Sequence, residues 1–138
     1  MTQTHVRFSA PSLTYRWLWQ TIGWLGVLII IALSLIPQPP SLPEPFSWDK
    51  FQHVLAYAVL MWWFRQAFTS RKLWAYMLLL LGVGLEGLQG LTSYRSLAYG
   101  DMVANALGVG CGIALASTPL GRAVNLFDRL MRRLIVGQ

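Results

Sequence analysis

The stretch "WLWQTIGWLGVLIIIALSLIP", residues Trp17 to Pro37, decides the fold class of this chain. It contains no Asp, Glu, Lys or Arg, and a helix of this length crosses a hydrocarbon core of roughly 30 Å. A cleaved signal peptide is the alternative, because Arg16 precedes the apolar run. However, "SLIPQPP" is a poor cleavage region and more apolar runs follow. We therefore expect a membrane-spanning helix.

The composition agrees with a membrane protein. Of 138 residues, 55% are hydrophobic and only 12% are charged, about half the charged fraction of a soluble domain. The apolar runs leave no room for a further soluble domain, so we expect residues 1–138 to form a single unit. Cys111 is the only cysteine and cannot form an intrachain disulfide.

Three more apolar runs follow the first. The proline-rich segment Gln38 to Pro45 cannot be helical and forms a linker. The later spans are expected at about residues 48–68, 73–91 and 101–117, the last being short and rich in small residues. The sequence therefore predicts an all-α integral membrane protein with four transmembrane helices.

The C-terminal segment, about residues 120–136, is predicted to be an amphipathic interfacial helix. Apolar residues recur at helical spacing, while the arginines lie mostly on the other face; the apolar residues are Leu120, Val124, Phe127, Leu130 or Met131, and Leu134. We expect this tail to lie flat on the inner leaflet of the membrane. The alternative is that it docks onto a partner helix.

The basic residues predict the orientation. Nine fall on one side of the four spans: Arg7, Arg16, Arg65, Arg71, Lys72, Arg122, Arg129, Arg132 and Arg133. Only Lys50 and Arg95 fall on the other, so both termini are expected in the cytoplasm. This distribution explains the net charge of +6 as a topology signal and a contact with anionic membrane lipid. No nucleic-acid partner is needed to account for it.

With this topology, the outer membrane surface receives nearly all the unusual polar residues. The second span supplies Asp49, Lys50, His53 and Tyr57, the third Glu86 and Gln89, the next loop Arg95, and the fourth span Asp101 and Asn105. Their spacing of three or four residues places the groups of each span on one helical face. We expect them to converge in one polar patch, with Gly82, Gly108 and Gly112 allowing close helix packing.

Structural roles are the alternative for several of these residues. Asp49 and Lys50 can lie among lipid headgroups, Tyr57 can serve packing, and amides such as Asn105 and Gln89 can join helices. Glu86 is harder to explain structurally, because a charged carboxylate at depth costs at least about 2.5 kcal/mol. We expect it to be paired, protonated or functional; the candidate partners are His53, Lys50 and Arg95.

The ordered motifs "DKFQHVLAYAVL", "EGLQ", "R" and "DMVANALGVGCG" resemble those of the VanZ-like family of small bacterial membrane proteins. The resemblance covers about residues 20 to 117 and departs from the family pattern at Ala98. It implies a bacterial cytoplasmic membrane location and a role in the cell envelope, since the family's namesake is associated with lowered susceptibility to the glycopeptide teicoplanin.

Three functions remain open at this stage. One is the binding or handling of a lipid-linked or lipid-like envelope molecule, with Lys50 and Arg95 meeting phosphate. Another is an intramembrane acid/base enzyme, a hydrolase or transferase acting on a lipid-phosphate; its tentative catalytic residues are His53, Glu86, Arg95 and Asp101. The third is a structural or assembly protein. The sequence does not predict an oligomeric state.

Neither a cofactor nor a resident metal is expected from the residue spacing. A metal site formed by His53 with Glu86, Asp49 and Asp101 is conceivable, but a lone histidine among carboxylates has no strong ligand spacing. Cys111 lies among glycines and has no clear catalytic partner, so a cysteine nucleophile is not expected.

Overall fold

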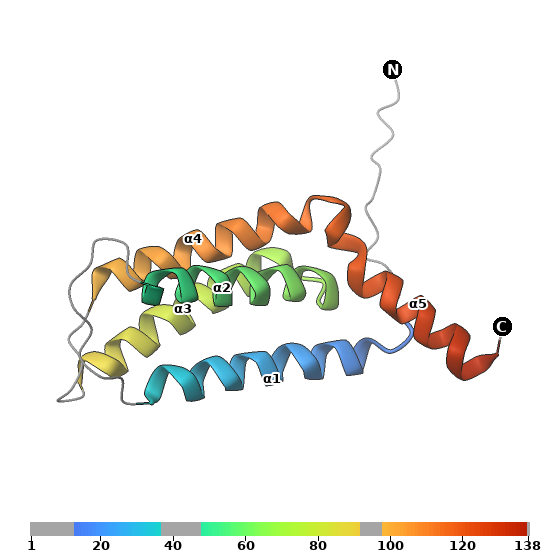
Figure 1. The fold of residues 1–138 in the computed structure, drawn as a ribbon, viewed down its shortest axis with the longest axis horizontal. Helices are drawn as coiled ribbons and strands as arrows, with labels where there is room; N and C mark the ends of the chain where they lie inside the picture. Colours follow the sequence, from blue (N-terminus) through green and yellow to red (C-terminus); the bar gives the residue numbers. More distant parts are fainter. Residues whose placement is uncertain (1–12, 37–47, 92–97, 138) are drawn as a thin grey trace, which may run out of the picture.

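A computed structural model of the chain describes residues 13–36, 48–91 and 98–137, nearly all of them in helices (Figure 1). The elements are α1 (Arg16–Leu35), α2 (Trp48–Ala67), α3 (Arg71–Gly90), α4 (Tyr99–Ala116), the 3₁₀ turn η1 (Pro119–Arg122) and α5 (Ala123–Val136). The predicted linker from Gln38 to Pro45 lies outside the described residues.

The first four helices form an antiparallel bundle (Figure 1). The C-terminal ends of α1 and α3 lie at the same end as the N-terminal ends of α2 and α4, and α5 lies at the other end. We call the end where α2 and α4 begin the site end, and the opposite end the α5 end. The alternating direction of the helices brings together polar residues that are about fifty positions apart in the chain.

Three of the described helices are long and apolar enough to cross a membrane: α1, α3 and α4. Large apolar side chains on them face outward, including Leu28 and Leu80, which are 59% and 65% exposed. Such a surface is unusual for a soluble monomer and suits a lipid environment. The chain is therefore an all-helical protein with membrane-spanning character.

Helix α2 has the same length as α1 and α3 but is less apolar, because its ends carry ionisable and amide side chains. It lies against α1, α3 and α4, and its packing against α4 is the most extensive in the bundle. Tyr57, Met61 and Phe64 of α2 are at most 2% exposed. Much of α2 is therefore covered by the other helices rather than by lipid.

Two glycines explain how closely α4 packs on α2. A Cβ atom at Gly108 would lie 2.5 Å from the carbonyl oxygen of Val54, and one at Gly112 would lie 2.5 Å from that of Ala58. Real Cβ contacts are never so short, so both positions need glycine for the backbones to approach. This contact fixes where Asp101 and Asn105 of α4 meet α2.

The C-terminal helix is more closely attached to the bundle than its apolar spacing predicted. Val124 is fully buried, and its N–H donates to Oε1 of Gln66 on α2 over 2.9 Å. Asp128, one turn later, accepts hydrogen bonds from the N–H groups of Thr14 and Tyr15 and from Nε1 of Trp19. One face of α5 therefore docks on protein.

The predicted apolar stripe of the tail is divided in the structure. Val124 faces the bundle, whereas four other members of the stripe remain outside and are 44–85% exposed: Leu120, Phe127, Leu130 and Leu134. The physical reason is Asp128, whose carboxylate supplies acceptors for two backbone N–H groups at the start of α1. The exposed apolar side chains are left free for another contact.

Candidate functional site

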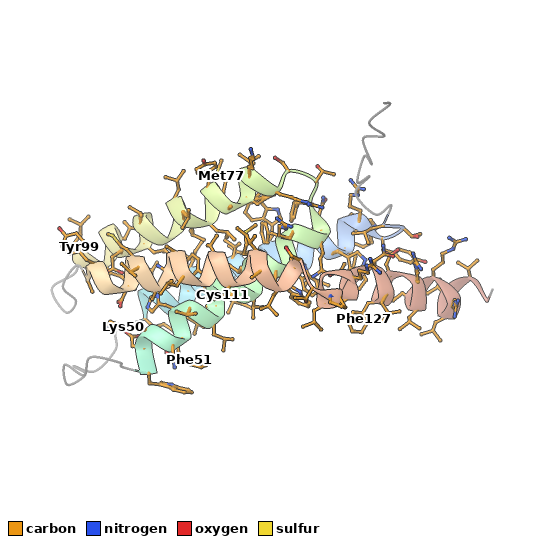
Figure 2. All side chains as sticks on the ribbon, turned by 90° about the horizontal axis from the view of Figure 1, so that it is seen from above. Lys50, Phe51, Met77, Tyr99, Cys111 and Phe127 are labelled. Atoms are coloured by element: carbon orange, nitrogen blue, oxygen red, sulfur yellow. The ribbon has the colours of Figure 1, made fainter. Side chains whose placement is uncertain are left out.

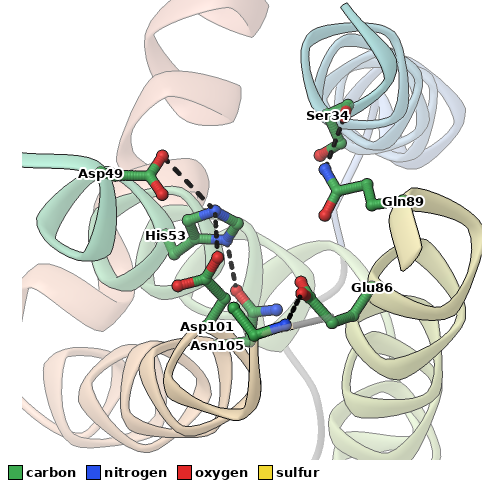
Figure 3. Close-up of polar contacts among 8 residues, drawn as sticks. Ser34, Asp49, His53, Glu86, Gln89, Asp101 and Asn105 are labelled. Atoms are coloured by element: carbon green, nitrogen blue, oxygen red, sulfur yellow. Dashed lines mark hydrogen bonds and ion pairs between the residues drawn. The ribbon is translucent and has the colours of Figure 1, made fainter. Parts of the chain in front are cut away.

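His53 is the centre of the polar patch at the site end (Figure 3). Its Nδ1 lies 3.0 Å from Oδ1 of Asn105 on α4. Its Nε2 lies 3.9 Å from a carboxylate oxygen of Asp49, one turn earlier on α2, and 3.9 Å from one of Asp101 on α4. Two helices therefore place two carboxylates and an amide around one imidazole.

The contact with Asn105 fixes the tautomer of a neutral His53. An amide oxygen only accepts hydrogen bonds, so Nδ1 must carry the proton that joins the two side chains. In the neutral ring, the lone pair then lies on Nε2, the nitrogen that faces the two carboxylates. The imidazole therefore offers an acceptor, or a metal ligand, at the centre of the patch.

Tyr57 extends the patch toward α3. Its side chain is only 2% exposed, and its hydroxyl makes no hydrogen bond to any residue in the described ranges. A Cβ at Gly82 would lie 3.2 Å from this hydroxyl and 2.9 Å from Nδ2 of Asn105. Because Gly82 has no side chain, Tyr57 and Asn105 can pack directly against α3 at this position.

Glu86 is buried, at 1% exposed, but it does not pair with His53 or Lys50 as the sequence led us to expect. Its Oε1 accepts a hydrogen bond of 2.6 Å from the N–H of Ala98, the residue that precedes α4. Among the described residues it forms no ion pair. Its carboxylate instead holds the N-terminal end of α4 against α3 (Figure 3).

The other predicted site residues take separate positions. Gln89 is buried and donates from Nε2 to the carbonyl oxygen of Ser34 on α1 over 2.5 Å. The Lys50 side chain lies over Gly100, where an added Cβ would be 2.9 Å from its Cε. Arg95 lies outside the described residues. The compact group is therefore formed by Asp49, His53, Asp101 and Asn105.

A mostly apolar cavity of about 620 Å³ lies between α1 and α2 and reaches this group. Ile30 and Leu33 of α1 and Val59 of α2 line its apolar part, while Asp49 and His53 line its polar end. Its volume is in the range of sites for small organic ligands. The site is thus an open, mostly apolar pocket with ionisable groups at one end.

Sequence reasoning did not assign α1 to the site. The residues that α1 adds to the cavity are apolar, apart from Ser34, and they have the same spacing as residues that face lipid. Only the packing of α1 against α2 distinguishes them. Cys111 was expected deep among glycines, but it is exposed on the side of α4 away from the site (Figure 2).

Comparison with family models, with curated proteins and with solved structures finds no match to this chain. The functional argument therefore depends on the geometry of the site.

Proposed function

We propose that this protein binds or handles a lipid-linked or lipid-like molecule of the bacterial cell envelope at its site end. The observation that carries this proposal is the cavity between α1 and α2, which joins an apolar chamber to the His53 group. A lipid with a polar head needs both parts, because burial of the acyl or prenyl chain supplies affinity and the polar end fixes the head.

The same proposal includes a membrane topology. All four bundle helices cross the cytoplasmic membrane, with α2 partly covered by its neighbours, and α5 lies at the inner surface. The excess of Lys and Arg at the α5 end supports cytoplasmic termini. The exposed apolar side chains of α5, together with Arg129 and Arg133, support an interfacial position.

The headgroup chemistry follows from charge. Lys50 lies at the site end of the bundle, and Arg95 follows α3 in the chain. Both cations suit a phosphate, whereas the carboxylates suit hydroxyl or amine groups. The resemblance to the VanZ-like family points in the same direction, because teicoplanin carries an acyl chain and acts at the outer surface.

A binding experiment with a polyprenyl phosphate tests this function. Val59 lines the cavity and is 51% exposed, so Val59→Trp should fill the chamber while leaving the core intact. Val83 on α3 is also 51% exposed but does not line the cavity, so Val83→Trp is the matched control. Affinity should fall at least about tenfold, or about 1.4 kcal/mol, only in Val59→Trp.

The polyprenol without its phosphate should bind more weakly than the phosphate to the wild type, because on this proposal a cation at the site end meets the phosphate charge. Equal weakening by both tryptophan variants would contradict the cavity as the binding site. If the purified protein binds neither probe, the remaining function is structural or in assembly.

An intramembrane acid/base enzyme acting on a lipid-phosphate is the second candidate. The lone pair on Nε2 of neutral His53 favours it, since this nitrogen faces the polar end of the cavity and can accept a proton. In such an enzyme, His53 would act as the base, and Asp49 and Asp101 would stabilise the imidazolium. Turnover of the bound lipid-phosphate, lost in His53→Ala with binding retained, would identify it.

A further inference from the structure

Three side chains at the site end have the chemistry and the proximity of a metal site. Asp49 and His53 come from consecutive turns of α2, and Asp101 comes from the first turn of α4. One ligand atom from each lies within 4.8 Å of the other two. Their side chains are 25%, 16% and 4% exposed, so the site is sheltered but reachable.

The distances require only a small closure around an ion. Zinc binds imidazole nitrogen and carboxylate oxygen at about 2.0–2.2 Å, which places the ligand atoms ~3.4 Å apart in a tetrahedron. The two distances from Nε2 of His53 are 3.9 Å. All three ligand atoms lie within 4.8 Å of one another, so they must draw closer together to bind one ion.

Asn105 prepares His53 for this role. A metal-binding histidine usually donates its other ring N–H to an oxygen, which fixes the ring and leaves the lone pair on the ligand nitrogen. His53 has this arrangement, because Nδ1 meets Oδ1 of Asn105 and Nε2 faces Asp49 and Asp101. The hydrogen bond between His53 and Asn105 is an observation separate from the three ligand distances. It leaves Nε2 of His53 as the nitrogen that can bind a metal.

The surroundings leave room for a fourth ligand. Asp49 and His53 line the cavity between α1 and α2, so an ion bound to them faces that chamber. A site with three protein ligands and an open position is typical of metals that bind water or a substrate. Glu86 does not belong to the group, because it holds the N–H of Ala98.

We propose that Asp49, His53 and Asp101 bind a divalent transition-metal cation of the Zn²⁺ class, with Asn105 as a positioning residue. The imidazole nitrogen favours zinc or a similar ion over Mg²⁺ or Ca²⁺, which prefer oxygen ligands alone. The open position takes water or an anionic oxygen such as that of a phosphate. The metal site does not depend on the lipid ligand proposed above and is tested without it.

The test uses the full-length protein, purified in detergent and freed of metal with a chelator. Zn²⁺ alone is added in competition with a chromophoric indicator, and the bound metal is counted by elemental analysis. We expect one Zn²⁺ per chain and a melting temperature that rises with the Zn²⁺ concentration. X-ray absorption of the wild-type complex should show one imidazole and oxygen ligands at about 2.0–2.2 Å.

Variants distinguish this site from adventitious binding. Asp49→Ala and His53→Ala should each weaken Zn²⁺ binding more than tenfold, and Asn105→Ala about 10–100-fold. Glu86→Gln removes a carboxylate at the same end of the bundle but outside the group, so its Zn²⁺ affinity should stay close to that of the wild type.

Two results would overturn the metal site. One is a wild-type protein that holds no stoichiometric Zn²⁺ when the ion is in excess. The other is binding that is equally strong in Asp49→Ala and His53→Ala. The wild-type measurements decide the matter even if a variant fails to fold, and neither result would affect the binding of a polyprenyl phosphate to the cavity.

Discussion

Nδ1 of His53 on α2 lies 3.0 Å from Oδ1 of Asn105 on α4 and joins the two most closely packed helices of the bundle through a side-chain hydrogen bond. Asn105 is 3% exposed, so this bond is sheltered from water. A sheltered polar pair fixes both the relative height of two helices and the orientation of the groups around it.

Asn105→Ala should therefore destabilise the bundle by about 1–3 kcal/mol, because Nδ1 of His53 would lose its partner in a buried place. The measurement is thermal unfolding in detergent, followed by helical circular dichroism. Asn125→Ala is a suitable control, since Asn125 accepts from Nε of Arg129 in an exposed contact on α5. A wild-type melting temperature in Asn105→Ala would show that the pair contributes nothing to stability.

Gly108→Ala should weaken the contact between α2 and α4. The added Cβ would lie 2.5 Å from the carbonyl oxygen of Val54, so the backbones must move apart at a cost of about 1–3 kcal/mol. Gly110→Ala offers a matched control, because an added Cβ there has no atom within 4 Å. That variant should be neutral or slightly more stable, since alanine favours a helix over glycine by up to about 1 kcal/mol.

The comparison of these two glycines can be made by unfolding in a denaturing detergent. Equal stability of Gly108→Ala and Gly110→Ala would mean that α4 does not meet α2 along the face described above, and Asp101 and Asn105 would lose their place beside His53.

Asp128 should make the attachment of α5 sensitive to acid. Burial by itself raises the pKa of Asp128, but the hydrogen bonds from Trp19, Tyr15 and Thr14 outweigh it and hold the pKa below its ordinary value. A carboxylate with a lowered folded-state pKa stabilises the fold above its unfolded pKa of about 3.9. This stability is lost as the pH falls through the lower, folded-state pKa.

Asp128→Asn should thus cost about 1–3 kcal/mol at neutral pH, because an amide replaces one of the two accepting oxygens by a donor. The loss of wild-type stability below pH 4 should be smaller in the variant, which has no carboxylate to protonate. Tryptophan fluorescence would report both effects, since Trp19 donates to this carboxylate. Parallel pH profiles for the two proteins would contradict this role of Asp128.

The sequence predicts part of the polar patch, because four of its residues recur every four positions near the ends of two apolar runs. Asp49, His53, Asp101 and Asn105 do lie together in the structure. Their function remains a prediction. The first, third and fourth runs do form helices, α1, α3 and α4, that are long and apolar enough to cross a membrane.

Contacts to the backbone could not be predicted in this way. Glu86 meets the N–H of Ala98, and Asp128 meets those of Thr14 and Tyr15. A backbone N–H is present at nearly every position, so no residue pattern marks the one that a distant carboxylate will reach. The cavity wall from α1 was missed for a related reason: an apolar residue that faces a chamber has the same sequence signature as one that faces lipid.

Glu86→Gln separates the structural role of this residue from a functional one. The amide oxygen of glutamine can still accept from the N–H of Ala98, so the variant should fold and melt within about 1 kcal/mol of the wild type. Glu86→Ala removes the acceptor and leaves a sheltered N–H without its partner, which should cost about 1–3 kcal/mol. If the charge of Glu86 serves ligand binding or catalysis, Glu86→Gln should lose that function despite its normal stability. The measurements are thermal unfolding of both variants and binding or turnover of the polyprenyl phosphate by Glu86→Gln. Full function in Glu86→Gln, together with the loss of stability in Glu86→Ala, would reduce Glu86 to an anchor for the start of α4 and confine the functional site to the group around His53.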